Sequence, residues 1–268
     1  MATAVFFHAH PDDETISTGG TMAKMAAQGH RVVVVTATGG ELGEVPDGLL
    51  GPGETLAERR AREVAEACSI LGVSRHVFLG YQDSGMDGEP SNDDPACFWR
   101  ADVDEAATRL RAILDEERAT VLTAYDEHGN YGHPDHIQVH RVGLRAAALA
   151  GTGHVFLATI NRDHFLSLIQ SAEDFGVAID DDQRESINDL GVRATKITTA
   201  VDVRRFLTSK RRAMEAHASQ IQETSFFLSM PPAAFEAAWG TEWYIRLGTE
   251  AGAAVESALI DDHADDGF

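Results

Sequence analysis

The first 160 residues alternate short β-favouring apolar runs with helical patterns, and this alternation limits the fold more than any other feature. The second run, at 31–36, holds four consecutive valines, which is typical of a parallel strand covered on both faces. Strands that alternate with helices favour a doubly wound sheet. We therefore predict a Rossmann-like α/β fold with a mostly parallel sheet over 1–160. A smaller C-terminal elaboration over 161–268 is predicted to complete the same domain and the substrate pocket.

The pattern is clear before residue 160 and weaker after it. The predicted strands are 2–8, 31–36, 76–79, 120–124 and 154–159, and the predicted helices between them are 16–28, 55–71, 102–117 and 136–150. Beyond residue 160 the pattern predicts a helix at 165–175, an extended segment at 194–203 and a helix at 204–223.

Charge and cysteine content narrow the class of protein. The 43 acidic and 22 basic residues give a net charge of −21, which disfavours nucleic acid and anionic membrane surfaces as partners. No apolar stretch approaches the roughly 20 residues that span a bilayer, so we predict no membrane insertion. Cys68 and Cys97 lack the spacing of a metal or disulfide motif, and no basic leader precedes residue 9. We expect a cytoplasmic protein, with homo-oligomerisation left open.

Two polar motifs follow predicted strands. AHPDDE at 9–14 follows the first strand, and YGHPDH at 131–136 follows the 120–124 strand. Adjacent acids at the start of a helix can act only as caps and as partners of the helix dipole. The repeat of His-Pro-Asp, followed by Asp13 in one motif and His136 in the other, argues against that interpretation. Since C-terminal ends of parallel strands meet at one edge of the sheet, we expect both motifs in one site.

The residue types in these motifs favour a catalytic metal centre. His10, Asp13 and His136 supply two imidazoles and one carboxylate, a set that suits zinc or ferrous iron and leaves positions open for water and substrate. We therefore predict one divalent metal ion, with zinc preferred over ferrous iron. No thiolates compete for it, because Cys68 and Cys97 lie in other segments.

Amide hydrolysis at such a centre also needs groups that move protons. A divalent metal lowers the pKa of water towards about 7, but a base must still accept the proton and an acid must protonate the leaving nitrogen. Asp12, beside Asp13, is the predicted base, and His133 is the predicted acid or oxyanion stabiliser. Asp135 is predicted to hold a ring of the cluster in its correct tautomer.

Two further histidines are predicted to be structural. His8 alternates with His10 along the first strand, so its side chain should point to the opposite face. His217 lies in a helical pattern with apolar neighbours, where a packing histidine is the ordinary explanation. Neither is included in the predicted site.

Together the two motifs resemble the PIG-L/LmbE-like family of metal-dependent amino-sugar deacetylases. Further segments follow in the family's order, so the resemblance covers most of the chain: TGGELGE at 38–44, Arg60 with Glu63, and Lys210 with HASQ at 217–220. Three segments are most similar to the branch that deacetylates N-acetylglucosaminyl-inositol in mycothiol biosynthesis: DSGM at 83–86, CFWRADVDEAATRL at 97–110 and YDEHGNYGHPDH at 125–136.

The resemblance implies the same metal ligands and the same roles for Asp12, His133 and Asp135. It also implies that Tyr131 is a mobile oxyanion contact, and that Arg60 and Asp83 contact sugar hydroxyls. The residues alone also allow purely structural roles, in which Arg60 forms ion pairs on a solvated helix face and Asp83 stabilises a turn.

The expected activity is therefore that of a metal-dependent amidohydrolase. It would remove the N-acetyl group of an N-acetylglucosamine-containing glycoside, such as N-acetylglucosaminyl-inositol, and the partner would be a small amino-sugar substrate. Alternatives are an amidase of mycothiol S-conjugates and a deacylase of a glycosylated natural product. A non-catalytic, metal-dependent sugar-binding protein is the alternative from another class.

Overall fold

The computed structural model describes residues 1–174, 187, 190–222, 224–225, 227–250, 252 and 255–260. Its strands are β1 (Thr3–His8), β2 (Arg31–Thr38), β3 (Arg75–Tyr81), β4 (Val121–Tyr125), β5 (His154–Thr159), β6 (Thr199–Asp202) and β7 (Thr241–Arg246). The described helices are α1 (Asp13–Ala27), α2 (Leu56–Leu71), α3 (Val103–Glu117), α4 (Gly129–Gly132), α5 (Pro134–Ala150), α6 (Arg162–Asp174), α8 (Leu207–Ala216) and α9 (Pro232–Trp239).

The described strands form a seven-stranded sheet in the order β3-β2-β1-β4-β5-β7-β6. β1 pairs in parallel with both β2 and β4, while β7 runs antiparallel to β5 and β6. The predicted doubly wound, mostly parallel sheet is thus confirmed. The direction of chain winding reverses between β1 and β4, and in open α/β sheets ligands bind at the carboxyl ends of the strands at such a point.

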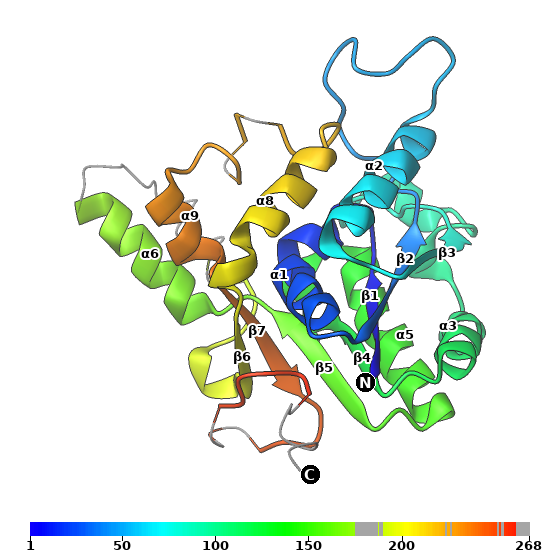
Figure 1. Cartoon of the computed structure of the whole chain (residues 1–268). Helices are drawn as coiled ribbons and strands as arrows, with labels where there is room; N and C mark the ends of the chain where they lie inside the picture. Colours follow the sequence, from blue (N-terminus) through cyan, green and yellow to red (C-terminus); the bar gives the residue numbers. More distant parts are fainter. Residues whose placement is uncertain are drawn as a thin grey trace.

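Helices cover both faces of the sheet (Figure 1). α1 packs with α2 and α8 on one face, and α3 packs with α5 on the other. Close packing sets the position of α5, because a Cβ at Gly143 would lie only 2.7 Å from the Cβ of Ala124 in β4. The buried core runs through the middle of the sheet, where Val5 of β1 and Val33 of β2 are fully buried.

Both motif-bearing helices begin earlier than the apolar pattern predicts. α1 begins at Asp13 and not at residue 16, and α5 begins at Pro134 and not at residue 136. The first turn of a helix carries polar residues that satisfy its free N–H groups, so apolar periodicity alone misses it. Consequently Asp13 and His136 are both held on first turns of helices at the same edge of the sheet.

The C-terminal predictions need more correction. The predicted helix at 165–175 is observed as α6, with residue 175 outside the described residues. The predicted extended segment at 194–203 is wrong at its start, because Ala194–Lys196 is a 3-10 turn and only Thr199–Asp202 is a strand. A helix through residue 223 is also wrong: Arg204–Phe206 is a 3-10 turn and α8 ends at Ala216, with residue 223 itself not described.

The early end of α8 has a physical reason. Just after it, the side chain of His217 contacts Glu14 and that of Ser219 contacts Glu63, and both acids belong to other helices. These long-range contacts outweigh the helical pattern of the segment. β6 and β7 join the same sheet as the N-terminal strands, while the division near residue 160 stays a prediction. No described helix is long and apolar enough to cross a membrane.

Candidate active site

The first motif joins β1 to α1 through a strained residue. Asp12 has φ 115° and ψ −35°, a backbone conformation that costs a residue with a side chain about 1–3 kcal/mol. Its N–H donates to Glu14 Oε2 at 2.8 Å, and its carbonyl accepts from the backbone N–H and the hydroxyl of Thr15. The surrounding hydrogen bonds thus hold the residue that was predicted to be the base.

The two histidines among the three predicted metal ligands both lie close to one oxygen atom of the third, Asp13. Asp13 Oδ2 lies 3.5 Å from His10 Nδ1 and 3.3 Å from His136 Nε2. All three side chains are buried, and the ring of His136 stacks on Tyr125 with the ring centroids 4.7 Å apart. Nitrogens of His10, His133 and His136 also lie within 4.8 Å of one another. The residues predicted as metal ligands are therefore neighbours in the structure, although the two motifs are more than a hundred residues apart in the sequence.

These residues fit a divalent metal ion. Four acids of this region are buried, Asp13, Glu14, Asp83 and Asp135, and the partly buried Asp12 lies with them; Arg60 is the arginine that pairs with Asp12. Burying charges of one sign is costly without a compensating charge. Among the described residues, His136 Nδ1 also lacks a hydrogen-bond partner. Two imidazoles, a carboxylate and an excess of negative charge are the features of a cation site.

The second nitrogen of His10 faces acids. Its Nε2 lies 3.1 Å from Asp135 Oδ2 and 3.5 Å from Asp83 Oδ1. Burial alone would lower the pKa of His10, but hydrogen bonds to Asp13, Asp135 and Asp83 raise it well above its usual value. A carboxylate behind a metal-binding imidazole fixes its tautomer and orientation. Asp135 thus contacts a ring of the cluster, as the prediction of its role requires.

His133 is neutral near pH 7, and its tautomer follows from its contacts. Burial, and then the nearby rings of His10 and His136, lower the pKa of His133 to about 4. Its Nδ1 accepts the backbone N–H of Asp135 at 3.1 Å, as an N-cap of α5. An accepting Nδ1 requires that the proton of the neutral ring sit on Nε2. His133 can therefore present an N–H donor to the site.

Tyr131 lies beside His136 and is partly exposed to solvent. Its side chain is 45% exposed, and its hydroxyl is 3.3 Å from His136 Nε2. The preceding Asn130 has φ 66° and ψ −54°, an uncommon conformation for a residue other than glycine. The backbone at the start of α4 is held by Asp126, which accepts the N–H groups of His128 and Asn130. Tyr131 thus extends from α4, whose backbone is held in place, towards His136, a predicted metal ligand.

Arg60 is buried and contacts the first motif. Its guanidinium donates to the carbonyls of Pro11 and Gly40, and its Nη2 lies 3.3 Å from Asp12 Oδ2. Burial raises the pKa of Asp12 to about 6, although Arg60 opposes this shift. A carboxylate with a pKa in this range can exchange protons near neutral pH. An ion pair on a solvated helix face is therefore the wrong explanation for Arg60, because its side chain is buried. Its contact to a sugar stays a prediction.

Asp83 lies on the opposite side of His10 from Asp13. Its carboxylate accepts the N–H groups of Gly85 at 2.9 Å and of Leu42 at 3.3 Å. Burial would raise the pKa of Asp83, but the hydrogen bond to His10, the charge of His10 and the N–H of Gly85 together lower it. The acid is therefore charged and borders the site, and its contact to a sugar hydroxyl stays a prediction.

The sequence analysis missed three residues that contact this cluster. Ser84 donates to the carboxylate of Asp135 through its hydroxyl and its N–H. Glu14 and His217 are fully buried, and His217 Nε2 lies 2.6 Å from Glu14 Oε1. Position inside the AHPDDE and HASQ segments was the signal that pointed to the last two. The ring of His8 bonds to Tyr125 and Thr18, and its structural role stays a prediction.

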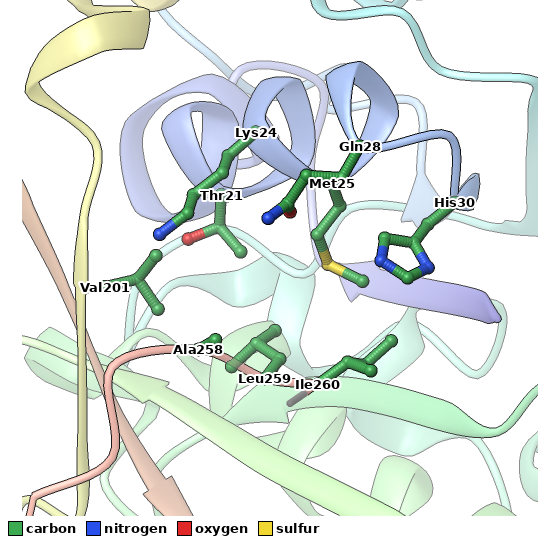
Figure 2. A pocket seen from close by; sticks show the side chains of 9 residues that line it. All are labelled: Thr21, Lys24, Met25, Gln28, His30, Val201, Ala258, Leu259 and Ile260. Carbon is green, nitrogen blue, oxygen red and sulfur yellow. The ribbon is translucent and has the colours of Figure 1, made fainter. Parts of the chain in front are cut away.

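Two hollows lie at the opposite end of the sheet. Figure 2 shows side chains of α1 facing Val201 and the segment 258–260. The space between them has a volume of about 10 Å³, room for about one water. A larger hollow of about 330 Å³ is lined by the starts of β1 and β5 and by Arg246, whose guanidinium pairs with Glu256 at 2.6 Å. Residues of the two motifs line neither hollow, so neither belongs to the candidate site.

Comparisons with solved structures agree with the fold. The chain resembles a conserved protein of Thermus thermophilus, with a TM-score of 0.57 and 21% identity over 91% of this chain and 94% of that one. It also resembles an N,N'-diacetylchitobiose deacetylase from Pyrococcus horikoshii, with a TM-score of 0.54 and 21% identity over 91% of this chain and 83% of that one. At these identities the likeness shows a shared fold.

Relatives found by sequence comparison are more similar to this chain than these solved structures are. A protein of Acidothermus cellulolyticus is 45% identical over 92% of this chain and 89% of its own length, and one of Thermomonospora curvata is 42% identical over 94% and 92%. Both are named 1D-myo-inositol 2-acetamido-2-deoxy-alpha-D-glucopyranoside deacetylase. The model of the PIG-L family, described as GlcNAc-PI de-N-acetylase, matches residues 5–147, which include both motifs. With that match over half of its length, and with its predicted ligand residues together at the switch point of the sheet, this chain belongs to the PIG-L family of amidohydrolases.

Proposed function

We propose that the chain hydrolyses the N-acetyl amide of an N-acetylglucosamine-containing glycoside, such as N-acetylglucosaminyl-inositol, and releases acetate and the free amine. The observation that carries this proposal is the meeting of His10 and His136 on one oxygen of Asp13, directly beside the strained Asp12. The names of relatives that are 42% and 45% identical over most of the chain support the choice of substrate.

His10, Asp13 and His136 would hold the divalent ion. Such an ion, zinc in preference to ferrous iron, polarises an amide carbonyl and makes water a stronger acid. The carboxylate of Asp135 would keep His10 oriented through its 3.1 Å contact to Nε2.

Asp12 would carry the proton through the reaction. It accepts a proton from the attacking water, whose oxygen bonds to the carbonyl carbon. It then returns that proton to the nitrogen as the C–N bond breaks, so acetate and the amine leave. The pKa of about 6 that burial produces at Asp12 supports both transfers near neutral pH.

His133 and Tyr131 would stabilise the negative charge that develops on the carbonyl oxygen. The Nδ1 of His133 is engaged by the N–H of Asp135, so its Nε2–H is available as a donor. The hydroxyl of Tyr131 lies 3.3 Å from His136 and can turn towards the substrate from its exposed position. Such donors stabilise the transition state more than the ground state.

Arg60 and Asp83 would contact sugar hydroxyls beside the acetamide. Asp83 Oδ1 is 3.5 Å from His10, and Arg60 Nη2 is 3.3 Å from Asp12, which supports a position next to the reacting group. The cytoplasmic location and the absence of a nucleic acid partner stay predictions from the sequence, and homo-oligomerisation stays open.

The test uses purified protein with added zinc or ferrous iron. Free amine should be released from N-acetylglucosaminyl-inositol or from a simpler acetylated glucosamine, and a panel with S-conjugates and acylated glycosides ranks the alternatives. Asp12→Asn should lower turnover by about 10²–10⁴-fold while metal stays bound. Asparagine is chosen because it tolerates positive φ better than alanine.

Glu127→Gln is the matched control. It removes one negative charge from an exposed side chain of the second motif region and should leave turnover unchanged. Release of amine from none of the glycosides would reject the proposed activity. Unchanged turnover in Asp12→Asn would reject the assignment of the base.

A further inference from the structure

A fully buried pair of side chains connects helix α8 to the backbone of Asp12. His217 lies just after α8, and its Nε2 is 2.6 Å from Glu14 Oε1. The other oxygen of Glu14 accepts the N–H of Asp12 at 2.8 Å. Both His217 and Glu14 have 0% exposure. The two hydrogen bonds of Glu14 therefore form a continuous connection from His217 to Asp12.

The connection ends on the strained part of the motif. Asp12 adopts φ 115°, and such a conformation persists only where its surroundings hold it. Its carbonyl is held by Thr15 inside the first turn of α1, but its N–H depends on the carboxylate of Glu14. If that carboxylate turned away, the N–H would lose its partner and the backbone could relax. The carboxylate of Asp12 would then move away from its contact with Arg60.

His217 is well placed to stop that movement. A glutamate side chain has several rotamers, and a second hydrogen bond on its free oxygen selects one of them. The backbone around His217 is itself held, because its N–H donates to Met214 and its carbonyl accepts the N–H of Ile221 at 2.7 Å. α8 is also joined to α1 where Lys210 donates to the carbonyl of Ile16 at 2.8 Å.

We propose that His217 is a positioning residue for hydrolysis: through Glu14 it holds Asp12 in the strained conformation that aims its carboxylate at the substrate. The inference rests on the proposed role of Asp12 as the base. A histidine that only fills space would stabilise the fold without affecting the rate of the chemical step, so the two roles can be separated by experiment.

Two substitutions at position 217 differ in reach. His217→Asn places its amide nitrogen near the position of Nδ1, too far from Glu14, whereas His217→Gln can reach the position of Nε2. We expect His217→Asn to lower kcat by about 10–100-fold, with KM and bound metal unchanged, because the base is misplaced while ligands and sugar contacts stay. His217→Gln should recover most of the loss.

Ser219→Ala is the matched control in the same segment. It removes the 2.6 Å hydrogen bond from the Ser219 hydroxyl to Glu63 and does not touch Glu14. It should lower thermal stability and leave kcat unchanged. If His217→Asn and His217→Gln lower stability alike and both keep the wild-type kcat, His217 is a packing residue and the proposal is wrong.

A double-mutant cycle tests the path through Glu14. Glu14→Ala, which removes both hydrogen bonds, should lower kcat at least as much, and the double variant Glu14→Ala/His217→Asn should be no slower than Glu14→Ala alone, because both act on one path. Additive losses would overturn the path. Glu14→Ala also serves if His217→Asn does not fold, since an unchanged kcat there rejects the proposal. Failure of Asp12→Asn to slow turnover would instead reject the proposed function, so the two failures are distinguishable.

Discussion

Two buried polar networks contact helix α1, and their charges are balanced in different ways. In the first, Lys210 Nζ lies 2.5 Å from Glu242 Oε1 and both side chains are buried. The carboxylate of Glu242 also accepts the N–H groups of Gly20 and Thr21 at 2.8 and 2.7 Å. Each charge of this clamp, defined as Lys210 with Glu242, is therefore matched within the chain.

The candidate site is the second network, and it is not matched in this way. Its acids outnumber the basic groups that pair with them, and in the described part of the chain His136 Nδ1 and Arg60 Nε have no hydrogen-bond partner. Completing a buried network requires partners for all its members. We infer from this difference that the clamp stabilises the fold by itself, whereas the polar groups of the site find their remaining partners in a cation and a substrate.

The largest expected effect on stability comes from breaking the clamp. Lys210→Met leaves Glu242 buried without its cation, and we expect the free energy of unfolding to fall by about 3–5 kcal/mol. Urea denaturation measures it. The double variant Lys210→Met/Glu242→Gln should lose less, because no uncompensated charge stays buried. A loss below about 1 kcal/mol, the range of exposed ion pairs, would show that the clamp is not the self-sufficient network described above.

A metal ion bound at the candidate site should stabilise the folded protein. Zinc at a hundredfold excess over its dissociation constant should raise the free energy of unfolding by about 2.7 kcal/mol. Asp13→Asn should abolish this gain and should also lower the stability without zinc, because the carboxylate loses its contacts with His10 and His136, which hold its pKa well below the usual value. Thermal unfolding with and without zinc measures both. An equal gain in the variant would contradict the assignment of Asp13 as a ligand.

A smaller effect is expected at the edge of the clamp. The hydroxyl of Tyr244 donates to Thr21 Oγ1 at 2.8 Å and lies 3.4 Å from Glu242 Oε2. Tyr244→Phe should cost about 1 kcal/mol, the usual net value of one hydrogen bond, because Glu242 keeps its other donors. Chemical denaturation detects the change, and turnover of the folded enzyme should not change. A cost near that of Lys210→Met would mean that the hydroxyl is essential to the clamp.

The smallest effect is expected for an exposed counterpart of the clamp. Hydrogen bonds from Arg31 and Arg75 lower the pKa of Glu117 from its usual 4.5 to about 2. Because the folded value is the lower one, the pair stabilises the fold above pH 4.5 and loses this contribution as pH falls towards 2. Arg31 is 43% exposed, so solvent limits the contribution to about 1 kcal/mol or less. Glu117→Gln should flatten stability in that window, and an unaltered pH profile would contradict the pairing.

The sequence analysis succeeded where contacts follow from topology. Strand-like runs alternating with helices predicted the parallel sheet, and parallel strands bring their carboxyl ends to one edge whatever the side chains are. The prediction that Asp13 and His136 would meet needed no further information. It failed where a local pattern competed with distant contacts: the helical pattern after Ala216 hid the turn that brings His217 to Glu14.

The sequence by itself determined the order of elements and the residue types of the site, because periodicity and motif spacing are local properties of the chain. Only the tertiary structure decided which atoms face each other. It set Asp12 at φ 115°, turned His10 Nε2 towards Asp135 and left Nε2 of His133 as the donor. These choices depend on how α8 packs on α1 and α5 on β4, and packing of segments far apart in sequence leaves no local pattern to read.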